Sequence, residues 1–200
     1  MANLTDLAND ALAAIGAAGS SNTAFLASLD DARNEAVLCK RFLASTDKSA
    51  SLIAHLLLDH KWNFAQARAS IAVDAVAPTF GYSYQYTLPA DYLLVHRVSE
   101  DDESAWMVEG GKIHTDLTSP IYIEYTAFIT DVNKWSSQFY QCMSTALQIR
   151  LCPPLKSDMK MAQALTSYLY STLLPEARAA DGVEGSQQVQ TTQDLILVRG

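Results

Sequence analysis

The sequence predicts an α+β protein in which helices from both ends of the chain pack into a bundle around an inserted antiparallel sheet. Apolar residues recur at helical spacing up to about residue 60, alternate with polar residues between 82 and 130, and then return to helical spacing. We therefore predict a discontinuous helical bundle of residues 1–81 and 131–182, a small sheet of residues 82–130 and an extended C-terminal arm of residues 183–200.

The N-terminal part is expected to hold two helices. Asn3 is a suitable N-cap for the first helix, and Asp6 follows three residues later, near the positive end of the helix dipole. Gly16 is expected to end this helix. Apolar residues from Asp31 to Asp59 then predict one long helix, with a possible kink near Thr46.

The central part has the two-residue period of strands. A tyrosine-rich face is predicted to pack on a core or a neighbouring subunit, and it contains Tyr82, Tyr84, Tyr86 and Leu88. Residues 92–98 predict a second strand, and residues 106–115 predict a hairpin that turns at Gly110-Gly111. Apolar residues alternate again from Ile121 to Ile129, which predicts a last strand.

Helices are predicted again after the sheet. One apolar stripe is formed by Trp135, Phe139, Cys142, Ala146 and Ile149. Pro153-Pro154 is expected to break this helix, and Ser157 is expected to cap the next one, which fades by Gly182.

Charge and hydropathy exclude some classes of protein. The net charge is −8 and the 14 basic residues are scattered, so a DNA-gripping surface is not expected, although an acidic wall could let DNA pass. Apolar runs such as Leu56–Leu58 are far shorter than the ~20 residues of a membrane span. The segment Met1–Asp6 lacks the basic start and apolar run of a signal peptide, so none is expected.

Residues that could carry chemistry are present but poorly arranged. Cys39, Cys142 and Cys152 are interpreted as buried free thiols, and no cofactor, metal site or catalytic residue is predicted. A glycan or peptidoglycan hydrolase is kept as an alternative because paired carboxylates can cleave such substrates. Its candidates are Asp101, Asp102, Glu103, Glu109, Asp116 and Glu124.

Five motifs, in order, resemble a family of phage proteins. Trp62 and Phe64, interpreted as core anchors, belong to the first of them. The matching segments are 56–68, 86–93, 108–116, 121–125 and 174–182, within a resemblance that spans about residues 4–182. Together they resemble the tail tubular protein A, or head-to-tail adaptor (gatekeeper), family of short-tailed bacteriophages. The second motif contains Leu88, Pro89 and Asp91, which the resemblance implies are structural anchors at a strand end.

The resemblance implies a structural virion protein rather than an enzyme. It implies a ring of about twelve copies in the tail, between the portal protein and the tail nozzle protein, through which DNA passes during ejection. It implies no cofactor and no catalytic residue, and synthesis in the cytoplasm of a bacterial host; no membrane partner is expected either, because the apolar runs are short. A second alternative is a host-derived cytosolic interaction module.

The C-terminal arm ends in a β-prone run after a polar linker. Four consecutive apolar residues, Leu195, Ile196, Leu197 and Val198, are unusual in a free tail. They could form an edge strand on the chain's own sheet, or they could add a strand to a neighbouring subunit or tail protein. The sequence favours the intermolecular alternative slightly, because such linkers are rarely needed for a local return.

Overall fold

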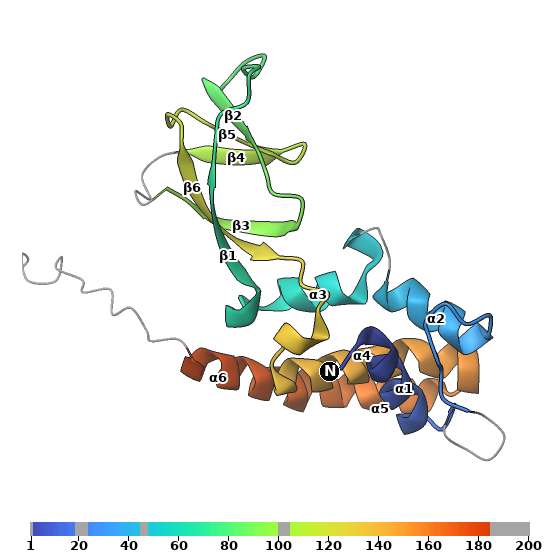
Figure 1. Ribbon diagram of the computed structural model, residues 1–200. Helices are drawn as coiled ribbons and strands as arrows, with labels where there is room; N and C mark the ends of the chain where they lie inside the picture. Colours follow the sequence, from blue (N-terminus) through green and yellow to red (C-terminus); the bar gives the residue numbers. More distant parts are fainter. Residues whose placement is uncertain (1, 19–23, 45–47, 100–104, 185–200) are drawn as a thin grey trace, which may run out of the picture.

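The computed structural model describes residues 2–18, 24–44, 48–99 and 105–184. It confirms the α+β class: strands form one part, helices form the other, and α3 lies between the strands and the long helix α4 (Figure 1). The helices of the described residues are α1 (Leu4–Ala14), α2 (Asn34–Leu43), α3 (Leu52–Asp59), α4 (Ser137–Lys156), α5 (Met159–Tyr168) and α6 (Leu174–Glu184). Shorter turns are η1 (Lys48–Ala50), η2 (Asn63–Ala65), η3 (Val132–Lys134) and the π-helical η4 (Leu169–Leu173).

The helices share one apolar core, with α4 at its centre. Helix α4 packs against α1, α2, α3, α5 and α6. Among the fully buried side chains of this core are Leu7, Leu12, Leu43, Leu57, Phe139 and Leu147. The predicted cap of α1 is confirmed, since the Asn3 side chain accepts the backbone N–H groups of Thr5 and Asp6.

The prediction of one long helix from Asp31 to Asp59 is wrong. Helix α2 ends at Leu43, and the chain makes the short turn η1 before α3 begins at Leu52. The ammonium group of Lys48 in η1 donates to the backbone carbonyls of Ala90 and Tyr92. These hydrogen bonds connect the turn between α2 and α3 to the start of the strand at residues 92–98. The periodicity of the local sequence cannot reveal such a long-range interaction.

In the described part of the chain, the strands form two three-stranded antiparallel sheets. Their bounds are β1 (Gln66–Ile71), β2 (Tyr84–Thr87), β3 (Tyr92–Val98), β4 (Trp106–Glu109), β5 (Lys112–Thr115) and β6 (Ile121–Ala127). The orders are β1-β6-β3 and β2-β5-β4. Both sheets contribute to a second core that includes Tyr86, Val98, Ile113, Ile121 and Ile123.

Strand β1 lies in a region that the sequence analysis assigned to the helical bundle, residues 1–81. Its residues pair with β6 from Gln66↔Thr126 to Ile71↔Ile121. Two alanines and a serine weaken its intrinsic strand preference, so the pairing with β6 determines its conformation. The strands therefore begin at residue 66 and not at 82.

The predicted hairpin that turns at Gly110-Gly111 is confirmed as strands β4 and β5. Val108 pairs with Ile113 and Glu109 with Lys112. Both turn glycines have positive φ, 57° at Gly110 and 78° at Gly111, as a tight two-residue hairpin turn requires.

The prediction that Pro153-Pro154 ends the helix is also wrong. Both prolines lie inside α4, which continues to Lys156. Ser157 has a left-handed conformation (φ 55°) and its N–H donates to the Pro153 carbonyl, so it closes α4. Asp158, and not Ser157, caps α5. At the other end of this region, α6 extends through Glu184, two residues into the predicted arm.

Candidate functional site

Trp62 and Phe64 lie where the helical part of the chain passes into β1. The Trp62 side chain is fully buried, and its indole N–H donates to the Leu56 carbonyl at 2.8 Å. Phe139 of α4 packs edge-on against both rings, with centroids 5.1 Å from Trp62 and 4.9 Å from Phe64. These aromatic contacts fix the exit of the chain from α3 against α4.

Asp181 of α6 is a buried carboxylate bound to the same junction. Its two carboxylate oxygens accept the Asn63 backbone N–H at 3.0 and 3.2 Å. The Asn63 side-chain amide donates to the Asp181 carbonyl at 2.6 Å, and His60 Nε2 lies 3.2 Å from the carboxylate. The ion pair between Arg178 and Asp59 adds a second link from α6 to α3.

These links join two of the motifs that carry the phage resemblance. The first motif supplies Asp59 to Phe64, and the last motif supplies Arg178 and Asp181. The sequence reasoning missed this contact. The sequence does contain a sign of this contact. Asp181 follows Leu174 and Ala177 at helical spacing, on the face that is buried, and a buried carboxylate needs a hydrogen-bond partner.

Leu88, Pro89 and Asp91 fasten the connection between β2 and β3. Leu88 is buried in the core of the sheets, and its N–H donates to the Gly111 carbonyl. The Pro89 carbonyl accepts the Tyr92 N–H. The Asp91 carboxylate accepts the Tyr125 hydroxyl at 3.2 Å, and its carbonyl accepts the Phe128 N–H at 2.6 Å. Thus all three residues hold local structure together.

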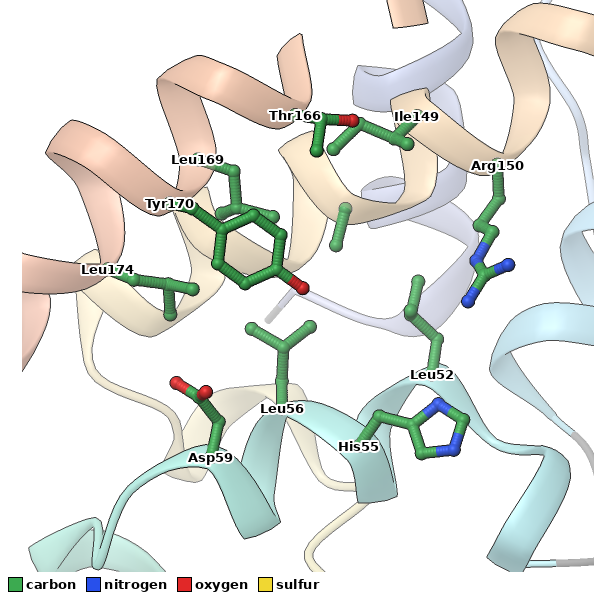
Figure 2. Close-up of a pocket in the computed structure, with 11 residues that line it drawn as sticks. Leu52, His55, Leu56, Asp59, Ile149, Arg150, Thr166, Leu169, Tyr170 and Leu174 are labelled. Atoms are coloured by element: carbon green, nitrogen blue, oxygen red, sulfur yellow. The ribbon is translucent and has the colours of Figure 1, made fainter. Parts of the chain in front are cut away.

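A second feature is a groove on the helical part, between α3, α4 and the run α5–η4–α6 (Figure 2). We call it the bundle groove; it is a cavity of about 290 Å³ whose apolar surface comes from Leu52, Leu56, Ile149, Leu169 and Leu174. The Tyr170 hydroxyl points toward this space. The π-helical turn η4 supplies two of the lining residues, Leu169 and Tyr170.

The rim of the bundle groove is polar and differs between its ends. His55 and Arg150 gather at one end, and Asp59 lies at the other (Figure 2). A smaller cavity of about 200 Å³ shares Leu52, His55 and Arg150 with the groove and adds Arg41. Within the described ranges, neither Arg41 nor Arg150 makes an ion pair with a carboxylate.

Two of the acidic residues considered for hydrolysis, Asp116 and Glu124, have lowered pKa values. Glu124 forms ion pairs with Lys61 and Arg68, and the hydrogen bond from Lys61 lowers its pKa. The Ser83 backbone N–H lowers the pKa of Asp116. A general acid in glycoside cleavage needs a raised pKa, so neither carboxylate suits that role. Glu109 is exposed beside the hairpin turn, and Asp101, Asp102 and Glu103 lie outside the described residues.

The three thiols are buried and free, as the sequence predicted. Burial raises the pKa of Cys39 to about 12 and that of Cys142 to about 11, and it also raises the pKa of Cys152. Protonated thiols are poor nucleophiles and poor metal ligands. Over residues 2–18, 24–44, 48–99 and 105–184, no group of three or more His, Cys, Asp or Glu side chains could hold a metal ion.

The predicted contact residues Leu195, Ile196, Leu197 and Val198 lie outside the described residues. No helix in the described part of the chain is both long and apolar enough to cross a bilayer.

No protein-family model matches the chain, and a search of curated proteins finds no match.

Proposed function

We propose that this protein is a structural subunit of a short-tailed phage tail, a ring-forming adaptor between the portal and the tail nozzle. The observation that carries the proposal is the contact of α6 with the junction after α3. It brings together two of the five motifs on which the resemblance rests, through the hydrogen bonds of the buried Asp181 carboxylate and the ion pair between Arg178 and Asp59. Contacts of this kind hold a scaffold together, which supports the role of an adaptor.

The loop between β1 and β2 supports an interaction role. At its base, the Asp74 carboxylate accepts hydrogen bonds from the Thr87 N–H and hydroxyl and from Lys112. Between this base and β2, Val76 is 70% exposed and Phe80 is 88% exposed. A loop with a fixed base and two large exposed apolar side chains is typical of a surface that a partner covers.

In this proposal, the helices of both chain ends act as one bundle that builds the ring. The sheets, with the loop that carries Val76 and Phe80, face the neighbouring tail component. The net charge of −8 is repeated in every copy, so the channel wall repels DNA phosphates and DNA slides without adhering.

The test is negative-stain electron microscopy of the full-length protein, alone and mixed with the portal protein of the same virus. Rings stacked on portal rings are the expected result. The matched variant Phe80→Ala should fold normally but attach less of the next tail component, whereas Lys160→Ala, an exposed change on α5, should behave as wild type. A protein that stays monomeric and ignores portal rings contradicts the adaptor proposal.

The hydrolase alternative has a direct test in zymography. The wild-type protein and the variants Glu109→Ala and Asp116→Ala are compared on peptidoglycan and on host glycans. We expect no clearing from any of them. Clearing by the wild-type protein that either variant abolishes would replace the adaptor proposal with an enzyme.

A further inference from the structure

A small cavity beside the bundle groove is lined by basic side chains from three helices. Its volume is about 200 Å³, and Arg41 of α2, His55 of α3 and Arg150 of α4 border it. The other lining residues are Phe42, Ala50 and Leu52. We call this space the arginine cavity. The Arg150 guanidinium extends from α4 toward α3, the helix that carries His55 (Figure 2), so the fold gathers positive charge from parts of the chain that are far apart in the sequence.

The acidic side chains that share a neighbouring pocket with these arginines already have partners. Asp30 and Asp31 border Arg41 on another side, and Asp59 lines the bundle groove with Arg150. These three carboxylates form ion pairs with Lys40, Arg33 and Arg178, respectively. In the part of the chain that the structure describes, no carboxylate lines the arginine cavity.

The basic groups of the arginine cavity have no partners of their own among the described residues. Over residues 2–18, 24–44, 48–99 and 105–184, the side chains of Arg41, His55 and Arg150 form no hydrogen bond and no ion pair. Each guanidinium carries five N–H donors, and two like charges beside one cavity repel each other. On a protein of net charge −8, this local excess of positive charge is not explained by the contacts of the fold.

We propose that the arginine cavity is a binding site for a small phosphate anion. The guanidinium groups of Arg41 and Arg150 hold the anion from α2 and α4, and the His55 imidazole donates a hydrogen bond to it from α3. The site is complete within one copy of the chain, so it does not depend on the proposed ring. The bound anion offsets the repulsion between the two arginines and links three helices of the bundle.

Phosphate fits this arrangement better than a carboxylate does. A carboxylate has two oxygens and one charge, so a single bidentate arginine satisfies it. A phosphate group carries a charge of about −1.5 to −2 at neutral pH and at least three acceptor oxygens, so it can bind two guanidinium groups at once. The positive end of the α3 dipole adds to their field, because Leu52 in the first turn of α3 also lines the cavity.

The arginine cavity suits an isolated phosphate group and not a nucleic-acid backbone. Its two guanidinium groups offset the charge of about one phosphate group. A duplex presents a long run of phosphates, which takes several more cations to neutralise. A phosphate site of this size is therefore compatible with a protein that does not grip DNA.

Isothermal titration calorimetry of the full-length protein with inorganic phosphate tests the site. The ionic strength is held constant with sodium chloride, so that general screening does not change during the titration. We expect saturable binding of millimolar affinity or tighter, and a melting temperature that rises with the phosphate concentration. The absence of both effects overturns the proposal. So does equal binding of acetate, because the site is expected to discriminate against a carboxylate.

Substitution of the arginines locates the binding. Arg41→Gln and Arg150→Gln should each weaken phosphate binding several-fold, and Arg150→Lys, which keeps the charge but loses the planar fork, should give an intermediate affinity. Lys160→Gln is the matched control, because it removes an exposed cation of α5 that lines neither the arginine cavity nor the bundle groove. Melting curves without phosphate show that each variant is folded. Equal phosphate affinity in all these variants overturns the site.

A comparison with adenosine monophosphate identifies the form of the ligand. Tighter binding of the nucleotide than of inorganic phosphate assigns the cavity to a phosphate ester, whereas weaker binding assigns it to the free anion. Either result supports a phosphate site if Arg150→Gln weakens the binding. Nucleotide and phosphate affinities that Arg41→Gln and Arg150→Gln both leave unchanged contradict it.

Discussion

Asn63 and Asp181 are 118 residues apart in the sequence and are joined by hydrogen bonds from both the backbone and the side chain of Asn63. Replacing Asp181 with Ala removes the acceptor of the Asn63 N–H, so we expect a loss of about 1–3 kcal/mol in the free energy of unfolding. Urea denaturation measures this loss. Glu176→Ala, an exposed change on the same helix, is the control and should leave the midpoint nearly unchanged.

Trp62→Ala should be more damaging, because it empties a fully buried site that also holds a hydrogen bond to Leu56. The expected loss of stability is about 3–5 kcal/mol. Phe80→Ala is the control, because that ring is almost entirely exposed. Thermal melts that show equal stability for these two variants would count strongly against Trp62 as an anchor.

The acid stability of the sheets should depend on Asp74. The hydrogen bond from Lys112, with those from Thr87, lowers the pKa of Asp74 below its usual 3.8. The folded state therefore gains stability from the ionised carboxylate above the unfolded pKa, and this gain is lost as pH falls through the lowered folded pKa.

Asp74→Asn tests this linkage. The variant should be less stable than wild type at neutral pH, and the difference should shrink as the pH falls toward about 2. The measurement is the free energy of unfolding from urea titrations at several pH values. If the free energy of unfolding of the two proteins changed in parallel across the acidic range, Asp74 would not contribute to the pH dependence of stability.

Duplex DNA should not bind the free protein at physiological salt. The net charge of −8 opposes binding, and Arg41 and Arg150 are too few to neutralise a run of phosphates. A gel-shift titration measures this, with a basic DNA-binding protein as the positive control. Micromolar or tighter binding would contradict the proposal that DNA passes through the ring without adhering to it.

Removal of residues 185–200 should spare the fold and impair assembly. An intermolecular arm, the alternative that the sequence favours slightly, adds nothing to the stability of its own subunit, so in that case the melting temperature should change little. Analytical ultracentrifugation and microscopy then measure ring formation. A truncated chain that melts earlier as a monomer indicates an arm that packs on its own subunit, and unchanged assembly indicates that the arm is dispensable.

The sequence predicted elements whose signals are local. The Asn3 cap and the Gly110-Gly111 turn act within a few residues of themselves, and both are present as expected. Strand β1 was missed because its Gln66–Ile71 segment becomes a strand only by pairing with β6, about 50–60 residues later. The break before α3 was similarly ambiguous, because Lys48 finds its acceptors at Ala90 and Tyr92.

The prolines of α4 show a different reason for error. Pro153 and Pro154 lack the backbone N–H that an α-helix needs for its hydrogen bonds. Prolines inside a helix therefore usually end it. Here the buried residues Leu151 and Cys152 hold the last turns against the core, and the Ser157 N–H closes the helix on the Pro153 carbonyl. Tertiary packing outweighed the local preference. The bundle groove could not be predicted either, because it needs three elements that only the fold brings together.

The π-helical turn Leu169–Leu173 lies between α5 and α6 in one continuous helical run. It rotates the side chains of α6 about the helix axis relative to those of α5. Successive residues in an α-helix are about 100° apart around the axis, so a locally wider turn rotates everything that follows relative to an uninterrupted α-helix. Ala162 on one side of the turn and Asp181 on the other can then both face α4 and its neighbours. Loss of one residue from this turn would aim the Asp181 carboxylate away from Asn63. The length of this short stretch therefore sets which residues of α6 meet the rest of the protein.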